Sequence, residues 1–230
     1  MENEYSFDEN TPPKEIVASA MTAIAEIMKN DGFKFSKSKL EIKKKTEEFI
    51  FQIYSQSNRY NAKGDNVRIY IHAFVSDNKG DVYFWGKLLS TSNAKQDVKQ
   101  WELYGKENYE QSLQKIKEII LSNLLPFFRR FEYDLQNFTN EVAEKGFCPF
   151  GDTQVYDADY KIPIDFLLKY GTKEQMNMAF QYYIDRHELW FVKPNIEKAI
   201  ALLKEGKEVV RNGEKDYAEF AVKHGVELIF

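Results

Sequence analysis

Hydrophobic and polar residues alternate most regularly in residues 67–75. The aliphatic positions are Val67, Ile69, Ile71, Ala73 and Val75, and the positions between them are Arg68, Tyr70, His72 and Phe74. A period of two residues is typical of a β-strand that buries one of its faces. The pattern therefore predicts a strand with one aliphatic face and one polar-aromatic face.

The segments around this strand predict an antiparallel sheet. Residues 48–57 and 81–85 are rich in the aromatic and β-branched side chains that strands favour, and residues 76–80 contain the Asp, Asn and Gly of a hairpin turn. Residues 33–45 are less regular and carry six lysines, which suits an edge strand that avoids pairing with other molecules. The same lysines would also suit an acidic partner, although a solvated edge is the simpler interpretation.

Amphipathic helices are predicted before and after the sheet. The first begins at Pro12 and Pro13, places an apolar stripe between Ile16 and Met28, and ends at Gly32. We expect it to cover the aliphatic face of the sheet. A second broad apolar face runs through residues 107–125, and after Pro126 the pattern continues to residue 146. Because proline interrupts helical hydrogen bonding, this region is either two helices or one bent helix.

Glycine and proline in residues 146–152 predict a domain boundary. Residues 1–146 then form an α+β domain, and residues 147–230 form a helical C-terminal subdomain in which Thr172 and Gln175 open a helix as a capping box. Residues 226–230 are either a closing strand or an apolar tail. The predicted fold class is α+β: an antiparallel sheet packed by an N-terminal helix and a long central helix, followed by an all-helical C-terminal part.

Composition narrows the class of protein. The 230 residues include 43% hydrophobic residues, which is enough for a sizeable core, and a single cysteine, Cys148, which excludes an internal disulfide. The net charge of -4 makes nucleic acid an unlikely partner unless a local basic patch exists. The acidic N-terminus does not resemble a secretion signal, and no apolar run is long enough for a membrane span. We therefore expect a cytoplasmic protein without membrane contact.

Histidine is scarce, which limits the catalytic possibilities. His72 shares a strand face with Tyr70 and Arg68, so it either acts as an acid or base in an aromatic cleft or simply packs there, the commoner situation in a sheet. His187 and His224 lie near predicted helix ends, without the spacing of a metal site. No catalytic residue is assigned from the sequence.

The polar segment 55–61 is the other candidate site. Its Gln56, Asn58, Arg59 and Tyr60 combine amide, guanidinium and phenol groups that suit recognition of a polar ligand or a partner's backbone. The alternative is a hairpin loop held by asparagine turn chemistry. Together with Arg68, Tyr70 and His72, these residues make up the predicted binding surface.

No metal or cofactor site is predicted. Asp152, Asp157 and Asp159 form an acidic loop without the register of a calcium-binding loop. Cys148 lies between apolar residues, which disfavours a reactive thiolate. Phosphate-binding glycine loops, serine elbows and dinucleotide fingerprints are missing from the sequence.

The order of a helix, the segment 31–38, the strand 44–53 and the polar run 55–61 resembles a bacterial domain-of-unknown-function family (DUF4304-like) over about the first 140 residues. The resemblance implies an α+β fold and a bacterial cytosolic setting, and it transfers no catalytic residue. By analogy with immunity proteins of toxin systems, the leading hypothesis is a non-enzymatic domain that binds another protein. The alternatives are a small hydrolase-like enzyme with a cleft around His72, and a small-ligand sensor.

Overall fold

The computed structural model describes residues 5–90, 100–150, 162–186, 192–209 and 215–229. The chain divides into two compact units, Met1–Tyr133 and Asp134–Phe230. The sequence analysis puts the boundary at residue 146, whereas the structure divides the chain before Leu135–Lys145 (α4) because that helix packs against later helices. The α+β fold class is confirmed.

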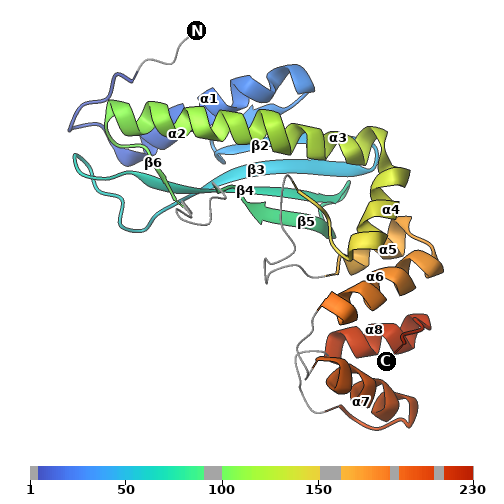
Figure 1. Cartoon of the computed structure of the whole chain (residues 1–230). Helices are drawn as coiled ribbons and strands as arrows, with labels where there is room; N and C mark the ends of the chain where they lie inside the picture. Colours follow the sequence, from blue (N-terminus) through green and yellow to red (C-terminus); the bar gives the residue numbers. More distant parts are fainter. Residues whose placement is uncertain (1–4, 91–99, 151–161, 187–191, 210–214, 230) are drawn as a thin grey trace. The chain divides into compact units, whose positions relative to one another are not determined.

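The first unit is built on an antiparallel sheet with the order β1-β2-β3-β4-β5, and a short sixth strand pairs with β4 (Figure 1). Its elements are α1 (Pro13–Met28), η1 (Lys29–Asp31), β1 (Lys34–Ser36), β2 (Glu41–Lys45), β3 (Phe49–Ser57), β4 (Arg68–Asp77), β5 (Tyr83–Leu88), β6 (Trp101–Glu102), α2 (Lys106–Ile119), η2 (Ile120–Leu124) and α3 (Leu125–Tyr133).

The alternation along β4 has the predicted consequence. Val67, Ile69, Ile71, Ala73 and Val75 are completely buried, whereas Tyr70, His72 and Phe74 are half-buried on the opposite face. β3 pairs with β4 along its whole length, from Phe49 opposite Asp77 to Ser57 opposite Ile69. This register sets which side chains of the two central strands are neighbours.

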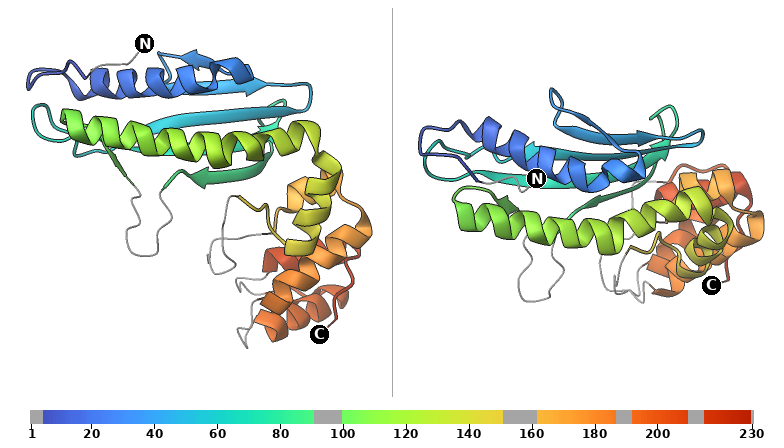
Figure 2. Two further views of the ribbon diagram at one scale, coloured as in Figure 1. Left: turned by 45° about the horizontal axis from the view of Figure 1, so that its top comes forward. Right: turned by 90° about the horizontal axis from the view of Figure 1, so that it is seen from above.

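Helices α1, α2 and α3 lie on one face of the sheet, as Figures 1 and 2 show. Rings join the two layers: Phe51 lies 4.9 Å from Phe128, and Trp85 lies 4.4 Å from Phe127, between ring centroids. The apolar side of α1 is buried from Ile16 to Met28, as the sequence predicts. The aliphatic face of the sheet is therefore the one that the helices cover.

The helix continues through Pro126 with a local change of winding. Proline has no N–H for the carbonyl four residues earlier. η2 is a π-helical segment immediately before it, in which the N–H of Leu125 bonds the carbonyl of Ile120. A π turn shifts the hydrogen-bonding pattern by one residue, so α3 follows without a stop. The helical path ends at Tyr133 instead.

Strands β5 and β6 lie along the same edge of β4. The backbone N–H of Leu89 bonds Ile71, and that of Leu103 bonds Val67, so the ladder resumes on the far side of Tyr70. The indole N–H of Trp101 donates to the carbonyl of Leu89 at 3.0 Å, which joins β6 to the residue after β5. Trp101 is buried, so its ring anchors β6 in the core.

The second unit is helical, as predicted. Its elements are α4, α5 (Ile164–Tyr170), α6 (Lys173–Arg186), α7 (Val192–Lys204) and α8 (Lys215–His224). The capping box at the start of α6 is confirmed, since the N–H of Thr172 donates to Gln175 Oε1 at 2.8 Å and the N–H of Gln175 donates to Thr172 Oγ1 at 3.2 Å. In this unit Phe138 packs edge-on against Phe166.

The segment after α8 is an apolar tail rather than a strand in its described residues. The amide side chain of Gln181 on α6 both accepts from the N–H and donates to the carbonyl of Ile229, and Asn177 accepts from the N–H of Glu227. Amides four residues apart on a helix thus bond alternate residues of an extended segment.

Crossing a membrane would take a longer and more apolar helix than any found in the described part of the chain.

Candidate functional site

Helices α1, α2 and α3 lie on one side of the sheet (Figure 2), and the aliphatic residues of β4 are buried beneath them, so the polar-aromatic face is turned away from these helices. We call it the open face. Residues opposite one another in the ladder share a face, so the register assembles it from several strands. One row across it is Lys34, Lys43, Gln52, Phe74 and Gly86, and the next is Ser36, Glu41, Tyr54, His72 and Leu88.

A cluster of rings occupies the centre of the open face. Tyr54 stacks on His72 at 4.9 Å between ring centroids and on Phe74 at 5.6 Å, with interplanar angles of 19° and 4°. Tyr70 lies 6.5 Å from His72, and the exposed Tyr83 meets Phe74 edge-on at 5.7 Å. We call these five residues the ring cluster. Several half-buried rings on a sheet face form the amphipathic kind of surface that interfaces use.

Gly86 makes room for one ring of the cluster. A Cβ atom on this residue would lie 2.6 Å from Cε1 and 2.7 Å from Cδ1 of Phe74. The ring of Phe74 therefore leans over β5 into space that any other residue would fill. A glycine within a strand often marks such a close approach.

An amide side chain orients the imidazole of His72. Its Nε2 lies 3.1 Å from Oε1 of Gln56, so this nitrogen carries the proton and the amide oxygen accepts it. Burial lowers the pKa of His72 below its ordinary value, because desolvation disfavours the charged imidazolium. The partners that the structure gives this ring are an amide and other rings, which suits packing and recognition.

Amide side chains border the ring cluster. Gln52 donates to Oε2 of Glu41 at 2.8 Å. Gln100 donates to the hydroxyl of Tyr70 and accepts from Nδ2 of Asn58 at 2.9 Å. These hydrogen bonds hold the hydroxyl of Tyr70 and the side chains of Glu41 and Asn58 in fixed positions at the border of the open face.

The asparagines of the polar loop are used to hold its backbone. Asn58 Oδ1 accepts from the N–H of Tyr60 at 2.8 Å, which is an Asx turn, while the Asn61 amide bonds both the N–H and the carbonyl of Arg68. Arg59 lies over the ring of Tyr60 at 4.6 Å from its centroid, and Tyr60 is 66% exposed. Only the tip of this loop is thus displayed for recognition.

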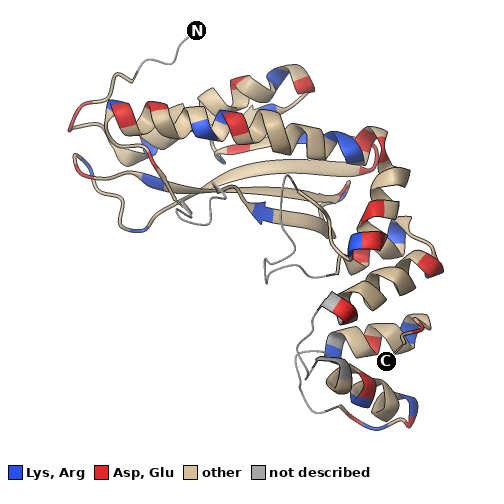
Figure 3. Ribbon diagram, viewed as in Figure 1, with Lys and Arg blue, Asp and Glu red and all other residues tan. Residues whose placement is uncertain are grey.

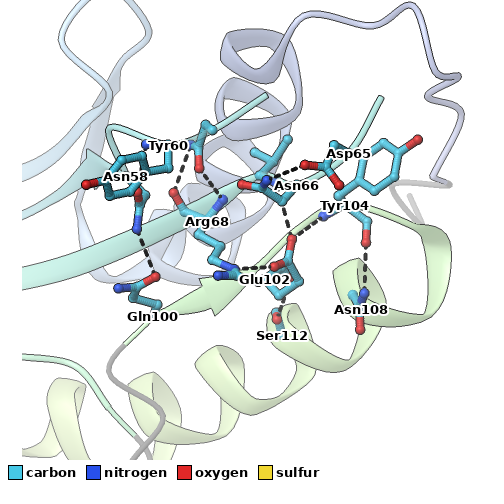
Figure 4. A network of polar contacts seen from close by, with 12 residues as sticks. Asn58, Tyr60, Asp65, Asn66, Arg68, Gln100, Glu102, Tyr104, Asn108 and Ser112 are labelled. Atoms are coloured by element: carbon cyan, nitrogen blue, oxygen red, sulfur yellow. Dashed lines mark hydrogen bonds and ion pairs between the residues drawn. The ribbon is translucent and has the colours of Figure 1, made fainter. Parts of the chain in front are cut away.

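Arg68 belongs to a structural network (Figure 4). Its Nε donates to Oε2 of Glu102 at 2.6 Å, while Oε1 of Glu102 accepts from the N–H groups of Val67 and Tyr104, both at 3.2 Å. The hydroxyl of Ser112 on α2 bonds the carbonyl of Glu102. Because the carboxylate of Glu102 stabilises the guanidinium, the pKa of Arg68 is raised. This network ties β4 and β6 to α2.

The predicted site residues fall into three groups. Tyr70 and His72 lie in the ring cluster with Gln56 beside them, Arg59 and Tyr60 form the loop tip, and Asn58 and Arg68 hold the structure together. Sequence reasoning placed Phe74 on this face of the strand without counting it as a site residue, and it missed Tyr54, Tyr83, Gln52 and Gln100. The alternation of residues 50–56 contains a signal for Gln52, Tyr54 and Gln56, but their neighbours depend on the strand register.

Other candidates are not part of this face. His187 and the aspartates at positions 152, 157 and 159 lie outside the described residues. His224 packs against Phe220 at 4.4 Å, and Cys148 is buried. Within the described ranges, no three residues of the metal-ligating types are grouped closely enough to hold an ion.

Comparison with known proteins found no similar protein. No family model, no curated protein and no solved structure matches this chain. The resemblance to a DUF4304-like family therefore stays a prediction, and function is argued from the geometry of the open face.

Proposed function

We propose that this chain is a non-catalytic recognition protein that holds a protein partner on its open face. One observation carries the proposal: the ring cluster lies on the sheet face opposite α1, α2 and α3, and its rings are only half-buried. Tyrosine and other aromatic residues supply much of the binding energy at protein interfaces, where a ring can be buried while its polar tip keeps a hydrogen bond.

The surroundings of His72 favour binding over catalysis. A general base needs a substrate proton or a nucleophile within hydrogen-bond reach. The described partner of Nε2 is Gln56, and the ring faces of His72 pack beside Tyr54 and Phe74. These contacts orient the imidazole as part of a packed surface.

The fixed amides around the cluster support recognition of a polar backbone. Gln56 and Gln100 are held by His72 and Tyr70, so they are ordered before a partner arrives. Ordering in advance reduces the entropy lost on binding. With the bacterial cytosolic setting that the family resemblance implies, the proposal is a cytosolic protein-binding domain, of which immunity proteins are one analogy.

The test is recovery of a partner by the immobilised full-length chain from a bacterial lysate, with substitutions on the two faces of the first unit. Tyr54→Ala removes the central ring, and Tyr133→Ala removes a 78% exposed tyrosine of α3 as a matched control. We expect recovery of the partner to fall at least about tenfold for Tyr54→Ala, the effect of one interface hot spot. Equal recovery by both variants would exclude the open face.

A separate substitution decides the part played by the polar loop. Arg59→Ala removes the guanidinium that lies over Tyr60 without touching the asparagines that hold the backbone. Loss of recovery would add the loop tip to the binding surface. Unchanged recovery would restrict that surface to the ring cluster.

A further inference from the structure

One edge of the open face carries concentrated positive charge. Residues 34–45 contain six lysines and one glutamate in a chain whose net charge is -4. The register puts Lys34, Lys43 and Lys45 on the open face, with Lys43 between Lys34 and Gln52. We call these three residues the lysine strip. By contrast, β3 has no charged residue, and α2 carries both signs (Figure 3).

The three lysines of the strip form no ion pair with a described residue. Lys44, whose side chain points to the helix side, lies 2.7 Å from Oε1 of Glu132. Among the described residues, no carboxylate lies within ion-pair distance of Lys34, Lys43 or Lys45. Lys44 is thus neutralised on the packed face of the sheet, whereas the lysine strip forms no ion pair with the described part of the open face, where the carboxylate of Glu41 accepts from Gln52 instead.

Lys34 and Lys43 also stand directly opposite one another. Like charges in this position destabilise a sheet. Protecting an edge against aggregation needs lysine on the outermost strand, and this accounts for Lys34. It does not account for Lys43, which lies on the second strand and pairs with β1 and β3, whereas Lys45 lies beyond the end of β1, where β2 is itself the edge of the sheet. A cost of this kind is expected where a binding surface needs the charge.

The lysine strip is continuous with the ring cluster. Lys43 is followed across the ladder by Gln52 and then by Phe74. Strands are spaced about 4.8 Å apart, so Lys43 and Phe74 are separated by about 10 Å along this row. A partner seated on the open face can therefore contact both the ammonium groups and the rings.

We infer that the partner held on the open face presents an acidic, extended protein segment to the lysine strip. This inference rests on the proposed function and names the chemistry of the partner. Lys43 and Lys45 are two residues apart on one face of β2, about 6.7 Å along the strand. Acidic residues at alternate positions of an extended segment have the same spacing, so each carboxylate meets one ammonium group.

The ring geometry favours a protein over a single-stranded nucleic acid. Bases bind such proteins by stacking on open ring faces. Here Tyr54, His72 and Phe74 stack on one another with interplanar angles of 4° to 19°, so their faces already contact neighbouring rings. The negative charge of the whole chain also opposes a polyanion at long range.

The experiment measures binding of defined probes to the full-length chain by fluorescence anisotropy. The first probe is a labelled peptide of about 15 residues in which glutamate alternates with serine and tyrosine, matching the two-residue period of a strand. The second replaces every glutamate by glutamine, and the third is an oligothymidylate with as many phosphates as the peptide has glutamates. The variants are Lys43→Gln/Lys45→Gln and, as a control of equal charge, Lys115→Gln/Lys117→Gln on α2, where both lysines are exposed.

We expect the glutamate peptide to bind most tightly and to weaken about tenfold in the β2 variant, and to weaken further at about 0.15 M salt. The α2 variant should change binding less than about twofold, because its charges lie off the open face. Failure of the glutamate peptide to bind, tighter binding of the oligothymidylate, equal binding of the glutamine peptide, or equal loss in both lysine variants would each overturn the inference.

The outcome is separable from that of the proposed function. Suppose that recovery of the partner needs Tyr54 but is unchanged by Lys43→Gln/Lys45→Gln. The open face would then still be the binding surface, but the inference of an acidic partner segment would be refuted. Recovery that is indifferent to Tyr54 would remove the proposed function itself. Thermal unfolding of each variant shows whether it is folded, and we expect the β2 variant to fold because its substitutions relieve like-charge repulsion.

Discussion

Gly86→Ala tests the placement of the ring cluster without removing any ring. The new Cβ would lie 2.6 Å from the ring of Phe74, whereas carbon atoms in contact are separated by about 3.5–4.0 Å. The ring must therefore move by about 1 Å, away from the positions in which it contacts Tyr54 and Tyr83.

The expected cost follows from those contacts. Each aromatic pair contributes about 0.5–1.5 kcal/mol beyond the area it buries, so disturbing two pairs costs about 1–3 kcal/mol. Replacing glycine by alanine within a strand returns about 0.5–1 kcal/mol. We expect Gly86→Ala to lower the stability of the first unit by about 1–2 kcal/mol.

The assay is native-state amide hydrogen exchange of Ala73 and Val75, which reports the opening free energy of β4 separately from the second unit. A double-mutant cycle with Phe74→Ala supplies the control. Once the ring is gone, Gly86→Ala should be neutral or stabilising. An equal loss of protection in both backgrounds would refute the reasoning, because the cost would then not come from the ring.

Four further substitutions test the polar parts of the site. Glu102→Ala should lower the free energy of unfolding by about 2–3 kcal/mol, because it breaks an ion pair and leaves two backbone N–H groups without an acceptor. Arg68→Ala should lower it by less than about 1 kcal/mol. Equal losses of stability for the two variants in urea unfolding would contradict the role given to Glu102. Because folding lowers the pKa of His72, the unfolded chain binds more protons, and the free energy of unfolding should fall as the pH drops through about 6.5 towards the folded pKa. The His72→Gln variant should lose this pH-dependent part of the stability. Identical pH profiles of stability for the two proteins would show that His72 does not contribute to it. Lys34→Glu should raise the thermal midpoint, with a gain of about 0.2–1 kcal/mol, by replacing its repulsion with Lys43 by attraction, and a lower midpoint would show that the two charges do not interact.

The sequence left two interpretations of the polar loop open, a recognition site and a turn held by asparagines. The structure supports the turn for some residues and surface exposure for others. The amides of Asn58 and Asn61 bond the backbone, as turn chemistry predicts, whereas Arg59 and Tyr60 remain at the surface. A polar run looks the same in sequence whichever way its side chains point. Only the path of the chain after the turn, which brings Arg68 back beside Asn61, separates the two.

The alternation of residues 67–75 was sufficient to predict β4, its aliphatic face and the presence of Tyr70 and His72 on the other face. The apolar stripes likewise predicted α1 and the long helix, and the turn residues predicted the hairpin. These features depend on intervals of two to four residues, over which the backbone geometry of strands and helices is nearly constant.

Sequence alone thus determined the main helices, the central strands and the two faces of β4, because the period of burial is a local property of the backbone, whereas the two-residue strand β6 left no such pattern. Tertiary structure decided which side chains share the open face. Tyr54 meets His72 across 18 positions, and Lys34 meets Lys43, only through strand pairing. Since a shift of register by one residue would turn each of these side chains to the other face, their grouping is a property of the assembled sheet.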